Sequence, residues 1–91
     1  MKANDDTEEL AKHLESKLIE LHGAVLLSGE ALYTSLGYRS ADAFRQAQAR
    51  NSIPVKVFSI KNRRGKFALV RDVALWLAQQ SVNDEDANMT D

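Results

Sequence analysis

The sequence predicts a mainly α-helical domain with one small β-hairpin. Three observations lead to this prediction. Leucines recur at helical spacing near the N-terminus, two short apolar helices flank a glycine turn in the middle, and a β-branched segment opened by Pro54 precedes a final apolar helix. The length of 91 residues, with 44% hydrophobic and 27% charged residues, is ordinary for a single small globular domain.

The first predicted helix runs from Asp5 to His22 and has Thr7 as its capping residue. Its leucines recur at spacings of four, four and three and form one apolar stripe: Leu10, Leu14, Leu18 and Leu21. The stripe has three interpretations: packing against its own domain, pairing with a second copy of the chain, or both. Because residues 23–80 can close a core without this helix, we expect the stripe to be a homodimer interface.

Two short helices follow. Ser28 can cap the first, over 29–36, and Ser40 the second, over 41–50. The four residues 37–40 join the helices and begin with a glycine, which suits a helix C-terminus. A short turn of this kind is typical of a helix-turn-helix.

The β-strands are short. We expect one at 24–27, and a hairpin in which 55–60 pairs with 66–69 across the 61–65 loop. Gly65 suits a left-handed position in that loop. The apolar alternation of the first hairpin strand is imperfect, which either a bulge or burial on both faces would explain.

The last predicted helix covers 70–80 and has apolar residues on one face. Residues 81–91 contain four acids and no base, and we expect them to be a disordered acidic tail. The predicted organisation is therefore a helix over 1–22, a domain over 23–80 and a tail over 81–91.

Charge is strongly segregated along the chain. Between Arg39 and Lys66 there are eight basic residues and one acid, Asp42, which gives this segment +7. Because the whole chain carries −1, the remaining residues carry −8. A surface of one sign and this size attracts polyanions and speeds their capture.

The predicted helix over 41–50 carries a polar face suited to DNA. Asp42, Arg45, Gln46 and Ala49 share that face by their spacing. Arginine can bind guanine, glutamine can bind adenine, and alanine can contact a thymine methyl group. The alternative interpretation is a solvated polar face. With the flanking and loop residues, the predicted DNA-binding set is Arg39, Ser40, Asp42, Arg45, Gln46, Ala49, Arg50, Lys61, Asn62, Arg63, Arg64 and Lys66.

Five stretches carry a resemblance to known proteins: LLSGEAL at 26–32, LGY at 36–38, FRQA at 44–47, IPVKVF at 53–58 and DVALWL at 72–77. Together they resemble the MerR-like and excisionase-like winged helix-turn-helix DNA-binding domains, including the pyocin-activator group. The resemblance implies a helix, turn and helix, then a hairpin wing and a closing helix. The N-terminal leucine-striped helix is an addition to that pattern.

These observations together predict a sequence-specific binder of double-stranded DNA, a transcriptional regulator of a bacterial, phage or plasmid system. Two alternatives stay open: an excisionase-like factor that bends DNA for recombination, and a module that docks an acidic protein partner. The expected location is the cytoplasm, on the nucleoid.

We expect no catalysis, metal, cofactor, small-molecule ligand or membrane association. The chain has no cysteine, no glycine-rich phosphate loop and no apolar run long enough to span a bilayer. His13 and His22 are nine residues apart on one predicted helix, about half a turn out of phase, so they cannot share a metal there.

Overall fold

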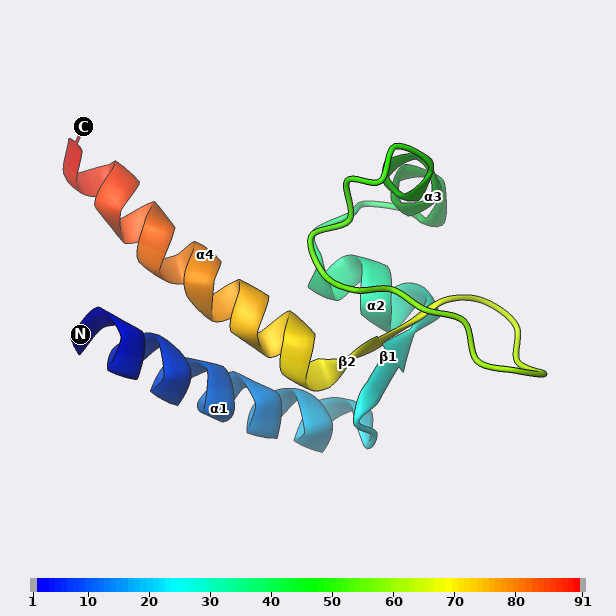
Figure 1. Cartoon of the computed structure of the whole chain (residues 1–91), viewed down its shortest axis with the longest axis horizontal. Coiled ribbons are helices and arrows are strands. Elements are labelled where there is room, and N and C mark those ends of the chain that lie inside the picture. Colours follow the sequence, from blue (N-terminus) through cyan, green and yellow to red (C-terminus); the bar gives the residue numbers. More distant parts are fainter. Residues whose placement is uncertain (1, 91) are drawn as a thin grey trace.

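The computed structural model describes the backbone of residues 2–90 and the side chains of residues 6–82. Within this part of the chain there are four helices and one two-stranded antiparallel sheet (Figure 1). The elements in order are α1 (Lys2–His22), β1 (Leu26–Ser28), α2 (Gly29–Ser35), α3 (Ala41–Ala49), β2 (Phe67–Leu69) and α4 (Val70–Thr90). The predicted mainly helical class with a small antiparallel sheet is therefore confirmed.

Both terminal helices are longer than predicted. Helix α1 begins at Lys2, so Thr7 lies inside it and is not its capping residue. Helix α4 continues to Thr90, so the prediction of a disordered segment from 81 is wrong for the backbone up to that residue; Asp91 lies outside the described residues. The reason is the same at both ends. Neither stretch contains a glycine or proline that would end a helix.

Helices α1 and α4 pack against each other and run antiparallel, so the start of α1 and the end of α4 lie at the same end of the molecule (Figure 1). We call them the helix pair. A helix of 21 residues is about 31 Å long. Because the helix pair extends beyond the sheet, the molecule is elongated, with a longest dimension of 43 Å. Helix α3 and the 61–66 loop lie toward the other end (Figure 1).

The sheet joins two segments that lie far apart in the sequence. Strand β1 pairs with β2 in the register Leu26 with Leu69, Leu27 with Ala68, and Ser28 with Phe67. The strand predicted at 24–27 therefore lies two residues later at its start. Gly23, with φ +72°, ends α1. Residues 24 and 25 complete the turn that leads from α1 into the sheet, so they are not part of the strand.

The predicted hairpin between 55–60 and 66–69 is reduced to one bridge. Phe58 and Phe67 exchange two backbone hydrogen bonds of 2.9 and 2.8 Å, and no strand forms elsewhere in 55–60. Val57 and Phe58 are both half-buried although they are neighbours in sequence, which breaks the alternation a longer ladder requires. Of the two explanations left open, this favours burial on both faces.

The hydrophobic core lies between the sheet, α2, α3 and α4. Its buried members are Leu27, Leu32, Leu36, Phe44, Ala68, Val70 and Val73. Leu18 and Ile19 extend this core to α1, and Trp76 and Tyr38 pack at its edge, as expected of aromatic anchors. No polar or charged side chain among residues 6–82 is buried.

Candidate nucleic-acid interface

Helix α3 is oriented by the turn that precedes it. Gly37, with φ +91°, ends α2 in a Schellman motif, in which the amide of Gly37 donates to the carbonyl of Thr34 (3.0 Å) and that of Tyr38 to the carbonyl of Tyr33 (2.9 Å). The Tyr38 ring then meets Phe44 of α3 edge-on, with centroids 5.8 Å apart. The contact links the turn directly to the buried side of α3.

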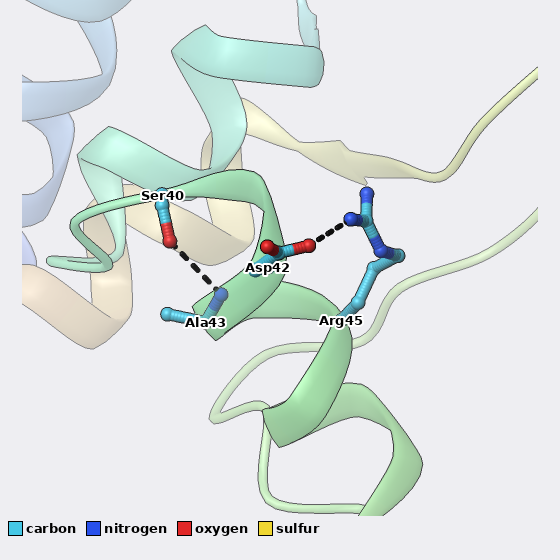
Figure 2. A network of polar contacts seen from close by, with 4 residues as sticks. All are labelled: Ser40, Asp42, Ala43 and Arg45. Carbon is cyan, nitrogen blue, oxygen red and sulfur yellow. Dashed lines mark hydrogen bonds and ion pairs between the residues drawn. The ribbon is translucent and has the colours of Figure 1, made fainter.

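Both ends of α3 are capped. The Ser40 hydroxyl accepts a hydrogen bond from the Ala43 amide (3.1 Å), which confirms the predicted cap (Figure 2). At the other end Asn51 has φ +57°, and the Ser52 amide donates to the Ala47 carbonyl (2.9 Å). Asparagine tolerates this left-handed conformation better than most residues, so the sequence contained a signal for this cap that was missed.

The exposed face of α3 is the predicted one. Phe44 and Ala47 are buried, and Ala41 is half-buried. Four other residues of the helix are exposed together: Asp42, Arg45, Gln46 and Ala49. The predicted flanking residues Arg39 and Arg50 are exposed at the two ends of the helix. The helical spacing thus assigned the two faces of α3 correctly.

Asp42 and Arg45 form an ion pair on this face. One carboxylate oxygen of Asp42 accepts from Nη2 of Arg45, one turn later on α3 (Figure 2). Both side chains are exposed, Arg45 to 66% and Asp42 to 76%. Both residues belong to the predicted DNA-binding set, but their pairing was not predicted from the sequence.

The 61–66 loop extends away from the body of the molecule (Figure 1). Its turn has Asn62 at φ +65° and Gly65 at φ +85°, so the left-handed position predicted for Gly65 is confirmed. The exposed residues of the loop are Lys61, Asn62, Arg63, Arg64 and Gly65. Lys66 differs from them: it is half-buried, and its ammonium group donates to the Ser59 hydroxyl (2.9 Å).

A shallow groove of about 280 Å³ lies between α2, α3 and the base of the loop. It is lined by Gly29, Tyr33, Ala41, Phe44, Arg45, Gln48, Gly65 and Lys66. The fold therefore brings Arg45 of α3 and Lys66 of the loop to one surface feature, although they are 21 positions apart. Tyr33 and Gln48 were not predicted here, because their position depends on where the loop base lies against α3.

The leucine stripe is divided between two environments. Leu10, Leu14 and Leu18 are half-buried, and Leu18 packs against the core of its own chain. Leu21 is 75% exposed. The first of the three interpretations, intradomain packing, therefore holds for Leu18, while pairing with a second copy stays a prediction for the outer edge of the stripe.

Other kinds of site find little support in the described part of the chain. His13 and His22 are both exposed on α1, and residues 6–82 contain no cluster of three metal-binding side chains. None of the described helices is long and apolar enough to cross a membrane.

The chain matches no protein-family model, no curated protein and no solved structure. The resemblance to winged helix-turn-helix domains accordingly stays a prediction that rests on residues 26–77.

Proposed function

We propose that the chain is a sequence-specific double-stranded DNA-binding protein with winged helix-turn-helix architecture. In this proposal α2, the Gly37 turn and α3 form the helix-turn-helix, and the 61–66 loop between Phe58 and β2 is the wing. Helix α1 is an addition to that unit.

One observation carries the proposal: Arg45, from the exposed face of α3, lines the same groove as Gly65 and Lys66 at the base of the basic loop, and all three belong to the segment that carries +7. A capped helix with a polar face fits the major groove, which is wide enough to admit an α-helix. A loop next to it can reach the flanking backbone or the adjacent minor groove. A solvated surface helix would not need a second basic element beside it.

The chemistry of the side chains separates residues that would contact bases from residues that would contact phosphates. Arg45 can donate hydrogen bonds to base edges, Gln46 can both donate and accept them, and Ala49 can contact a thymine methyl group. Arg39, Arg50, Lys61, Arg63 and Arg64 would contact phosphates, which fixes the register of the protein on DNA without selecting a sequence. We propose transcriptional regulation as the role, on DNA in the cytoplasm of a bacterial cell.

Selection from a random pool of duplexes tests the proposal. The expected result is an enriched sequence bound much more tightly than unrelated DNA, with affinity that falls steeply as salt rises, by a log–log slope of ~0.9 per phosphate contact. Failure to bind any duplex at low salt would overturn the proposal and favour an acidic protein partner. Strong bending of the selected duplex would instead favour a recombination factor.

We further propose that the protein acts as a homodimer through the outer edge of α1 and so reads an inverted repeat. Leu21 in the last turn of α1 and Val25 just after the helix are exposed large apolar residues, 75% and 62% exposed, that could take part in this contact. Half-sites would then lie about one helical turn, or a multiple of it, apart.

The variant Leu21→Glu tests the dimer without disturbing the core, since Leu21 is exposed in the single chain. Light scattering should give the wild type twice the chain mass of 10.1 kDa and the variant that mass alone. The variant should also lose affinity for the full repeat but bind a half-site normally. A wild type that is monomeric at the concentrations that saturate DNA would contradict the dimer.

A further inference from the structure

The only acid in the +7 segment is paired with a cation placed to read bases. Asp42 lies one turn before Arg45 on α3, and their side chains reach toward each other (Figure 2). The pairing uses one N–H of Nη2 of Arg45 and leaves its other donors, including those on Nη1 and Nε, without a partner among the described residues.

The other cations of the segment are treated differently. Within the described part of the chain, six of them have neither an ion pair nor a side-chain hydrogen bond: Arg39, Arg50, Lys56, Lys61, Arg63 and Arg64. Lys66 donates to the neutral hydroxyl of Ser59. Among the described cations of this segment, only Arg45 is held by an opposite charge. Asp42 also lies in the first turn of α3, where an acid stabilises the helix dipole, but phosphate affinity gains nothing from a carboxylate at this position.

We infer that Asp42 is a specificity-determining residue that withholds Arg45 from phosphates and orients it toward a base edge. This inference rests on the proposed DNA-binding function. On unrelated DNA, Arg45 could gain a phosphate contact only by leaving Asp42, and the carboxylate would be repelled by the same phosphate. At the correct base pair, Arg45 can donate to guanine through its remaining donors while the pair persists.

The pair also limits the rotamers of Arg45 before DNA arrives. A long arginine side chain loses conformational entropy when it is ordered at a base. Because the pair with Asp42 already restricts Arg45 in the free protein, less entropy is lost on binding. Both effects favour the selected sequence over unrelated DNA, so the carboxylate raises the ratio of the two affinities and does not raise affinity itself.

The experiment compares Asp42→Asn with Glu20→Gln. Glu20 forms an exposed pair with Lys17 at the same three-residue spacing (3.8 Å), but on α1, away from the basic loop. Both changes remove one negative charge. Affinities for the selected duplex and for an unrelated duplex are measured at two salt concentrations, and circular dichroism verifies that each variant keeps its helix content.

Asp42→Asn should raise affinity for unrelated DNA about two- to fivefold, the worth of an exposed ion pair, and lower the specificity ratio by a similar factor. Glu20→Gln should leave the ratio unchanged. Asp42→Glu keeps the charge and should largely restore the ratio. In an Arg45→Ala background, Asp42→Asn should no longer change the specificity ratio, because the carboxylate then has no arginine with which to pair.

Two results would overturn the inference: Asp42→Asn raising both affinities by one factor, or the change in ratio persisting without Arg45. In both cases the wild type still prefers its selected sequence, so the proposed function survives. A wild type that binds no DNA would overturn the proposed function itself.

Discussion

The two ends of this molecule differ in net charge and in their content of regular secondary structure. The helix pair consists of two 21-residue helices, each with a net charge of −3. The basic half, residues 39–66, carries +7 and contains only the nine residues of α3 as regular structure. The two lie toward opposite ends of the molecule (Figure 1). Near DNA such a charge distribution orients the protein before contact, since the field attracts one end and repels the other.

The two regions also differ in what holds them in place. The helix pair is stabilised by packing along its length, whereas the basic half depends on turns and caps: the left-handed Gly37 just before it, the left-handed residues Asn51, Asn62 and Gly65 within it, and the Ser40 cap. Specific recognition needs side chains at fixed positions, and in the basic half the turns and caps must hold them there. Equal substitutions in the two regions should therefore have unequal effects.

The largest contrast should come from two leucines. Leu32, beneath the basic half, is 1% exposed, and Leu32→Ala should lower the free energy of unfolding by about 2–5 kcal/mol, because it removes transfer energy and leaves a cavity. Leu21→Ala, at the end of the helix pair, should change the free energy of unfolding by less than about 0.5 kcal/mol at protein concentrations where the proposed dimer is dissociated, because Leu21 is 75% exposed in the single chain. Urea denaturation at low protein concentration measures both. Equal losses would mean that Leu21 is covered within the single chain.

Two glutamines test where sequence is read. Gln46→Ala on α3 should weaken binding to the selected duplex by about 1–3 kcal/mol and leave unrelated DNA almost unchanged. Gln80→Ala, equally exposed on α4, should change neither affinity. Fluorescence anisotropy on both duplexes gives the numbers. If the specificity ratio of the Gln46 variant matched that of the wild type, α3 would not be the reading element.

Two serines test the caps. Ser40→Ala should cost about 1 kcal/mol of stability because Ala43 loses its side-chain acceptor. Ser28 also precedes a helix but makes no side-chain capping bond, so Ser28→Ala should have a much smaller effect. Thermal unfolding followed by circular dichroism compares them. A larger loss at Ser28 would contradict the assignment of Ser40 as the device that holds α3.

The smallest effects should come from single arginines. Arg64→Ala in the loop should weaken all duplexes alike and reduce the slope of log affinity against log salt by about one. Arg71→Ala on α4 removes the same charge from the helix pair and should leave that slope unchanged. Salt titrations on unrelated DNA resolve the difference. A reduced slope for the Arg71 variant would place DNA on the helix pair.

Much of the basic half was predictable because its signals are local. Ser40 predicts a helix cap and Gly37 predicts a turn, each from its own side-chain and backbone chemistry. Helical spacing places Phe44 on the buried face of α3 and Gln46 on the exposed face. The pairing of β2 was not predictable in this way. Both the 55–60 segment and β1 are apolar and β-branched or leucine-rich, and the choice between them depends on the long-range contact of Leu27 with Ala68.

At the C-terminus, composition alone predicts the wrong structure. The acids after Gln80 favour disorder, whereas the absence of glycine and proline permits a helix there, and α4 continues to Thr90. At the candidate site, the three-residue spacing of Asp42 and Arg45 permits an ion pair but does not establish one. The groove lined by Arg45 and Lys66 was not predictable from the sequence, because no local pattern determines where the end of the loop packs against α3.

The pairing of β1 with β2 and of α1 with α4 has a consequence for biosynthesis. Strand β1 pairs with β2 and α1 packs against α4, so the intervening chain leaves the ribosome before its core can close. Until β2 and α4 follow, Leu27 and Leu32 stay exposed to water, and contacts this distant in sequence form slowly. A nascent chain stalled before Phe67 should accordingly be a substrate for chaperones and proteases, however well its two short helices are capped.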